Sequence, residues 1–107
     1  MRNVVYNKLV RDKVPEVAVK AGQIPYYRKL ASYEFLPELN KKLLEEVQEY
    51  LKTNNIEEIA DILEVMAAIL EVNNISREEI KGIMDRKAQE RGKFKDMIYL
   101  ESVDKPD

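Results

Sequence analysis

Apolar residues recur at helical spacing in two adjacent stretches, and this pattern constrains the fold of the 107-residue chain more than any other feature. The stretches cover about residues 32–51 and 56–72. Apolar side chains three, four and seven positions apart lie on one face of an α-helix. Only a short turn around Thr53-Asn54-Asn55 separates the stretches. The pattern therefore predicts two antiparallel helices that pack as a hairpin.

Helix-start and helix-stop signals predict two further helices. Residues 76–79, Ser-Arg-Glu-Glu, have the form of a capping box, and the helix that they open should end near Arg91, just before a glycine. Asp12 is a candidate N-cap for a short helix with Pro15 in its first turn. That short helix should end near Ala21, again before a glycine.

The remaining segments complete the expected fold class. Residues 24–30 and 97–103 are short and rich in β-favouring side chains, so they could pair as a small two-stranded β ribbon. No internal repeat or linker divides the chain. We therefore expect one domain over residues 1–107 with a mainly all-α fold, a helical bundle around the hairpin.

The absence of two residue types narrows the chemistry. The chain has neither cysteine nor histidine, which excludes disulfides, thiolate nucleophiles and zinc sites of the usual kind. Any metal must be held by oxygen, which favours Mg²⁺ or Mn²⁺. The net charge of -2 gives no general attraction to nucleic acid. There is no apolar run of membrane-spanning length and no signal-peptide pattern, so we expect a cytoplasmic protein without a membrane partner.

Four acidic residues have a spacing that ordinary surface charge does not require. Glu46 and Glu49 are three positions apart on the first hairpin helix, and Glu58 and Asp61 are three apart on the second. Each pair lies on one face of its helix, at the edge of the apolar arc. The two pairs mirror each other about the turn, so they should meet at similar heights. Four converging carboxylates repel one another, and a bound divalent cation removes that repulsion.

Two simpler interpretations of these acids stay open. The carboxylates could be solvated helix charges that pair with Lys41, Lys42 or Lys52. Glu58 could instead complete a capping box with Asn55 as the N-cap.

Basic residues gather in two places that could receive phosphate. Lys87 and Arg91 are one helical turn apart near the end of the last helix, where cations also complement the helix dipole. Lys8, Arg11 and Lys13 form a second group, which could equally be a solvated N-terminal segment. No glycine-rich phosphate loop is present.

These motifs resemble a known family, the all-α nucleoside triphosphate pyrophosphatases called MazG-like, which include the phosphoribosyl-ATP pyrophosphohydrolases. The family pattern Glu-Glu-x-x-Glu followed by Glu-x-x-Asp is similar to residues 45–49 and 58–61 here. Residues 8–15, Lys-Leu-Val-Arg-Asp-Lys-Val-Pro, and residues 87–94, Lys-Ala-Gln-Glu-Arg-Gly-Lys-Phe, resemble a small single-domain house-cleaning branch. Lys93 departs from the family, where many members carry a second glycine.

The resemblance implies Mg²⁺-dependent hydrolysis of a non-canonical nucleoside triphosphate between the α and β phosphates, giving a monophosphate and pyrophosphate. It implies that the metal ligands are Glu46, Glu49, Glu58 and Asp61. Glu45 would orient or deprotonate the attacking water, although its position on the helical wheel is off the metal-facing edge. Three cations would contact the substrate phosphates, namely Arg11, Lys87 and Arg91. Family members are usually homo-oligomers, so a dimer or tetramer is expected.

Three rival functions remain. The first is phosphoribosyl-ATP hydrolysis, which shares the metal and the chemistry. The second is a non-catalytic helical module that binds a partner or only a nucleotide. The third is a structural dimeric bundle whose acids are only solvated charge.

Overall fold

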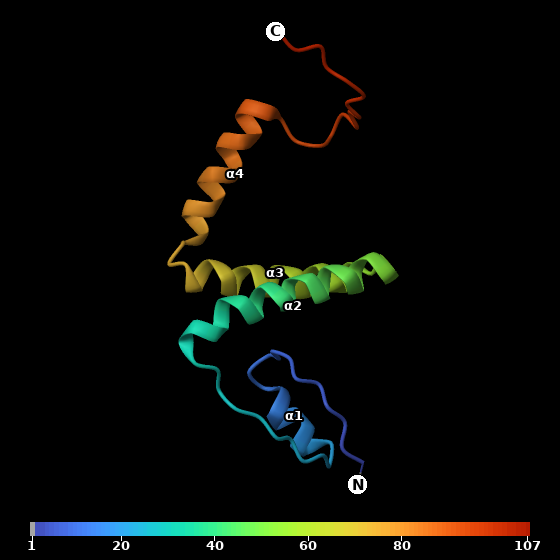
Figure 1. Cartoon of the computed structure of the whole chain (residues 1–107), viewed down its shortest axis with the longest axis vertical. Helices are drawn as coiled ribbons and strands as arrows, with labels where there is room; N and C mark the ends of the chain where they lie inside the picture. Colours follow the sequence, from blue (N-terminus) through green and yellow to red (C-terminus); the bar gives the residue numbers. More distant parts are fainter. Residues whose placement is uncertain (1) are drawn as a thin grey trace. The chain divides into compact units, whose positions relative to one another are not determined.

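The computed structural model describes residues 2–107 and contains four α-helices over that part of the chain (Figure 1). The helices are α1 (Val14–Lys20), α2 (Ser32–Thr53), α3 (Ile56–Val72) and α4 (Arg77–Arg91). Residues 2–107 form no β-strand, so the predicted all-α fold class is confirmed. None of these helices combines the length and the apolar character needed to cross a bilayer.

The predicted β ribbon is not formed. Residues 24–30 and 97–103 contain neither strand nor helix, although both have β-favouring composition. A strand gains its stability from hydrogen bonds and side-chain pairs with a partner strand, and an isolated two-stranded pair is marginal in water. Pro25 also lacks the N–H group that a ladder requires.

The chain divides into two compact units, Met1–Asn74 and Ile75–Asp107, and each unit is described by itself. The first contains α1, α2 and α3, and the second contains α4. The single domain expected over residues 1–107 stays a prediction.

The N-cap of helix α1 lies one residue later than predicted. Lys13, not Asp12, occupies the N-cap position, and no side chain bonds to the helix N-terminus there. A backbone turn replaces the side-chain cap, because the N–H of Val14 donates to the carbonyl of Arg11 at 3.1 Å. The prediction that Asp12 caps this helix is therefore wrong, while Pro15 lies in the first turn as expected.

Helix α2 begins at Ser32 as predicted and continues through Pro37. Glu34 stabilises its start, since its carboxylate accepts a hydrogen bond of 2.9 Å from the backbone N–H of Ala31. Arg28 donates to both oxygens of the same carboxylate, at 3.1 and 3.0 Å. The Arg28 guanidinium and then the Ala31 amide lower the pKa of Glu34 from 4.5 to about 2.

This ion pair gives a pH dependence that can be measured. Because the folded pKa of Glu34 lies below its unfolded value, its contribution to stability is fully present above pH 4.5 and is lost as the pH falls towards about 2. We expect the difference in unfolding free energy between wild type and Glu34→Gln to shrink across that interval. Urea unfolding at a series of pH values measures it, with Glu57→Gln as a control in an exposed acid. A difference that stays constant with pH would contradict the assignment.

The α2–α3 hairpin is the centre of the first unit, and its helices lie side by side (Figure 1). Asn54 ends α2 in the left-handed conformation, with φ of 52°, which asparagine tolerates better than most residues. Asn55 then caps α3, since its side chain accepts from the N–H of Glu57 at 3.0 Å. The predicted α3, residues 56–72, matches the observed helix at both ends.

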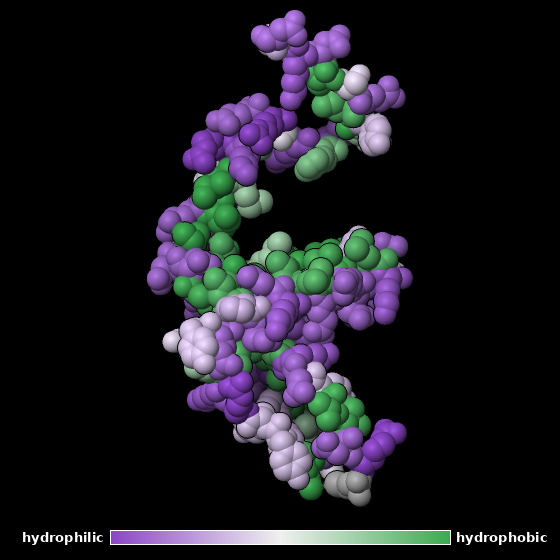
Figure 2. Space-filling view, viewed as in Figure 1, coloured by the Kyte–Doolittle hydropathy of each residue, from purple (hydrophilic) through white to green (hydrophobic). Residues whose placement is uncertain are grey.

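The hairpin has one apolar side and one polar side (Figure 2). Among the described residues only Leu39 and Val65 are fully buried, at 3% and 9% exposure. Several large apolar side chains of α2 and α3 remain exposed, namely Leu44, Leu51, Ile56, Leu63 and Met66. Leu44 and Leu51 are seven positions apart, as are Ile56 and Leu63, so each pair shares a helix face.

In the second unit, α4 begins with the predicted capping box. The hydroxyl of Ser76 accepts from the N–H of Glu79 at 3.1 Å, and the Glu79 carboxylate accepts from the N–H of Ser76 at 3.3 Å. The helix ends at Arg91, as predicted, and Gly92 follows with φ of 80°. That positive φ is readily adopted by glycine.

Candidate metal centre

Three of the predicted ligands come together on the polar side of the hairpin. Glu46 of α2 meets Glu58 and Asp61 of α3, and one carboxylate oxygen from each lies within 4.8 Å of the others. Glu46 and Asp61 meet because they lie at similar distances from the turn on neighbouring antiparallel helices, and Glu58 joins them because it is three positions from Asp61 on the same face of α3. All three side chains are half-buried.

The donor set fits a hard divalent cation. All three donors are carboxylate oxygens, which Mg²⁺, Mn²⁺ and Ca²⁺ prefer. Two oxygens bound to one Mg²⁺ at about 2.1 Å are at most about 4.2 Å apart. The three oxygens lie within 4.8 Å of one another, which is close to that range.

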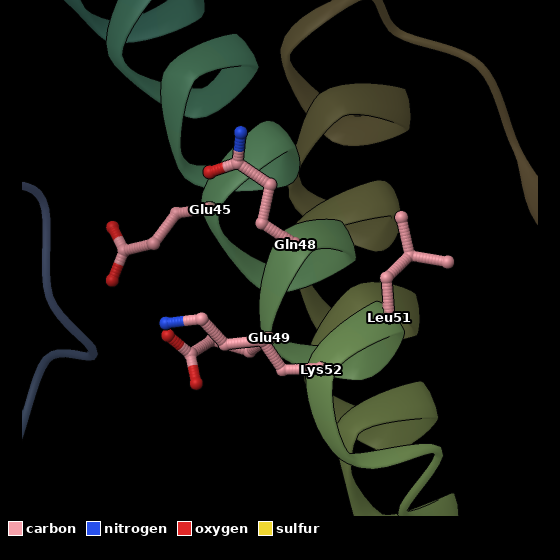
Figure 3. Close-up of a pocket in the computed structure, with 5 residues that line it drawn as sticks. All are labelled: Glu45, Gln48, Glu49, Leu51 and Lys52. Carbon is pink, nitrogen blue, oxygen red and sulfur yellow. The ribbon is translucent and has the colours of Figure 1, made fainter.

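Glu49, the fourth predicted ligand, lies outside this three-residue group. It is exposed and lines an open groove on α2 with Glu45, Gln48, Leu51 and Lys52. Figure 3 shows Glu45 and Glu49 pointing to the same side of α2, while Leu51 points away from it. Glu49 is still near enough for its charge to act on Glu58. Its role as a ligand stays a prediction.

Repulsion among the clustered carboxylates affects the pKa of Glu58. Partial burial first, and then the charge of Asp61, raise the pKa of Glu58, with smaller contributions from Glu46 and Glu49. Both causes disfavour the ionised form, so ionised Glu58 destabilises the fold when no cation is bound. A divalent cation at the cluster would reverse this effect.

This repulsion predicts opposite effects of one substitution with and without metal. Glu58→Gln should stabilise the metal-free protein, because it removes a charge from the cluster. Added Mg²⁺ should stabilise wild type and have little effect on the variant. Thermal unfolding with EDTA or Mg²⁺ measures both effects, and Glu57→Gln, a change in the exposed acid next to it, is the matched control. Equal stabilisation of Glu58→Gln by Mg²⁺ would contradict the predicted ligand role.

Two lysines hold Glu45, the residue predicted to act on water. The ammonium groups of Lys8 and Lys42 lie 2.9 and 3.3 Å from the same oxygen, Oε1. Lys42 also lies 3.3 Å from Oε1 of Glu46. The hydrogen bond from Lys8 is the largest cause of a lowered pKa at Glu45. A carboxylate with a lowered pKa is a weaker base, which favours an orienting role over proton abstraction.

Arg11, in the N-terminal segment before α1, contacts the cluster at Asp61 of α3. Its Nη2 donates to Oδ1 of Asp61 at 2.8 Å, and its Nη1 lies 4.0 Å from Oε1 of Glu64. Asp61 is 50 positions away in the sequence. The N-terminal basic group is therefore not simply solvated, since two of its members pair with hairpin acids. Lys8 was not among the predicted site residues. The signals for it were its place in that basic group and in the segment 8–15 that resembles the family.

Lys87 and Arg91 are exposed and lie one turn apart on α4, in the second unit. Their predicted contact with substrate phosphates stays a prediction.

Two simpler interpretations of the acids were a capping box between Asn55 and Glu58 and pairing with lysines of the same helices. Asn55 does cap α3, but its backbone N–H donates to the Thr53 hydroxyl at 3.1 Å, so no capping box engages Glu58. Pairing with helix lysines is found in part, because Lys42 contacts both Glu45 and Glu46.

Comparison of the chain with models of protein families, with curated proteins and with solved structures found no match.

Proposed function

We propose that this protein is a Mg²⁺-dependent nucleoside triphosphate pyrophosphohydrolase, with Mn²⁺ as an alternative cation. The observation that carries the proposal is the meeting of three carboxylates from both hairpin helices, with cations from the N-terminal segment beside them. Oxygen-only donors next to basic side chains suit a metal shared with a polyphosphate. The resemblance of residues 45–49 and 58–61 to the MazG-like motif supports the same reaction.

In this proposal the side chains divide into three roles. Glu46, Glu58 and Asp61 would hold the cation, with Glu49 as the fourth candidate. When bound, the cation would polarise a phosphoryl oxygen and make a coordinated water a better nucleophile. Glu45 would accept a hydrogen bond from the attacking water and orient it.

Arginine and lysine would neutralise the triphosphate. Arg11 can donate two hydrogen bonds in a fixed geometry that matches phosphate oxygens. Its Nη2 lies 2.8 Å from Oδ1 of Asp61, one of the proposed ligands, which supports a role beside the cation. Lys87 and Arg91 are the further candidates for the leaving pyrophosphate. Positive charge beside the pyrophosphate would stabilise the negative charge that builds up on the leaving group.

The experiment that tests the function is product analysis. The purified protein is incubated with ordinary and damaged nucleoside triphosphates and with phosphoribosyl-ATP, each with Mg²⁺ or EDTA. We expect a nucleoside monophosphate and pyrophosphate that disappear with EDTA. Hydrolysis of phosphoribosyl-ATP alone would assign the rival substrate. No product from any compound would contradict the proposed enzyme and leave a binding module or a structural bundle.

We also propose that the protein is a homo-oligomer. The exposed apolar side chains on α2 and α3 support this, since large apolar patches on soluble proteins usually mark interaction sites. Light scattering after size exclusion should give a dimer or tetramer, and Leu44→Glu with Leu63→Glu should shift it towards monomer. A wild-type monomer at about 100 µM, far above the Kd of a stable interface, would contradict the proposal.

A further inference from the structure

We infer that Lys8 is a positioning residue that acts through Glu45, which makes the N-terminal segment a part of the proposed catalytic site. The inference rests on the proposed function and goes beyond it, because it assigns a role to a residue outside the metal-ligand and phosphate-binding sets.

The first argument is which oxygen the lysines contact. Lys8 and Lys42 both donate to Oε1 of Glu45, at 2.9 and 3.3 Å. No hydrogen bond from residues 2–107 reaches Oε2 of the same carboxylate. One oxygen is therefore anchored and the other is left to accept a hydrogen bond from water. Two donors on a single oxygen also restrict rotation of the carboxylate about its final torsion.

The second argument is the link to the acid cluster. The ammonium group of Lys42 lies 3.3 Å from Glu45 and 3.3 Å from Glu46, so it ties the orienting carboxylate to a predicted metal ligand. Its side chain is only 16% exposed, which limits its freedom. Lys42 is local, since it lies three and four positions before these acids on α2. Its contact with Glu45 is the longer of the two, so Lys8 supplies the closer donor.

The third argument is how Lys8 reaches the site. Lys8 and Arg11 are three residues apart in the N-terminal segment, yet they pair with acids on different helices, Glu45 of α2 and Asp61 of α3. The segment thus crosses the polar side of the hairpin with one anchor on each helix. Figure 3 shows the N-terminal ribbon, in blue, on the side to which Glu45 points. A segment held at two points can place the Lys8 ammonium reproducibly.

The test is a double-mutant cycle on the turnover of wild-type protein with Mg²⁺ and the nucleotide found by product analysis. Lys8→Met should lower kcat about 10- to 100-fold, the usual effect of losing a partner that orients a site residue. KM should change less than twofold, because the inferred role of Lys8 is to hold Glu45 and not to bind the substrate. Lys8→Arg, which keeps the charge and a donor, should recover most of the kcat. In a Glu45→Gln background, Lys8→Met should have no further effect, since the pair acts as one unit.

Matched controls and four outcomes decide the inference. Lys20→Met, which lies outside the basic group and pairs with Glu16 on α1, should leave kcat unchanged. Lys41→Met should do the same, since Lys41 pairs with Glu38 and not with Glu45. Additive losses in the Glu45→Gln background, or a raised KM with unchanged kcat, would overturn the inference and leave the proposed function standing. An inactive wild-type protein would overturn both. A loss of kcat in Lys8→Met that is accompanied by loss of the helical signal in circular dichroism would be explained by unfolding, and it would also overturn the inference.

Discussion

Glu46→Gln and Asp61→Asn should each lower Mg²⁺-dependent turnover at least about 100-fold while leaving the helical fold intact. Glu46 and Asp61 contribute one oxygen each to the cluster, from different helices of the hairpin. A bound divalent cation supplies several kcal/mol of transition-state stabilisation, and each 1.36 kcal/mol corresponds to a tenfold change in rate. An amide keeps the shape of the side chain but removes the charge that holds the cation.

The comparison is made by steady-state kinetics and circular dichroism on the same preparations. Glu64→Gln is the matched control for Asp61, because Glu64 is one turn further along α3 and 63% exposed. Its turnover should stay within about threefold of wild type, in line with the weak contribution of exposed ion pairs. Wild-type-like turnover in any two variants of the predicted ligands Glu46, Glu49, Glu58 and Asp61 would remove the proposed site.

Leu39→Ala should give the largest loss of stability of any single side-chain truncation in the first unit. Leu39 is 3% exposed and is one of the two fully buried residues among those described. Truncation of a buried leucine to alanine costs about 2–5 kcal/mol, from lost transfer free energy and the cavity left behind. A typical domain has an unfolding free energy of only about 5–15 kcal/mol, so this loss is a large fraction of the total.

Urea unfolding with a linear extrapolation measures that loss. Leu39→Met, which nearly conserves volume, should cost less than about 1.5 kcal/mol. Tyr33→Ala, at an 82% exposed position on the same helix, should change stability by less than about 0.5 kcal/mol. If Leu39→Ala cost no more than Tyr33→Ala, the packing of α2 against α3 would differ from that described.

The helices of this protein were determined by local sequence. Apolar spacing and cap residues placed α3 and α4 close to their observed bounds, because Asn55 and Ser76 satisfy N–H groups that lie within three positions of them. The hairpin followed from the shortness of the turn between its helices. The meeting of Glu46 and Asp61 followed in turn from their similar distances to the turn, and Glu58 shares a helix face with Asp61. The same spacing also predicted Glu49, which lies outside the three-residue group.

Contacts between distant segments were decided only by tertiary structure. The β ribbon was expected from composition but did not form. Composition shows that a segment suits a strand, but it does not show whether a second segment lies beside it to pair with. The helical wheel placed Glu45 off the metal-facing edge, and it carries no information on a lysine 37 positions earlier. Lys8 and Arg11 reach Glu45 and Asp61 along residues 2–31, a stretch without a long helical pattern to predict its path. The acids of the candidate site were therefore readable from helical spacing, whereas their cationic partners depended on how the chain folds back over the hairpin.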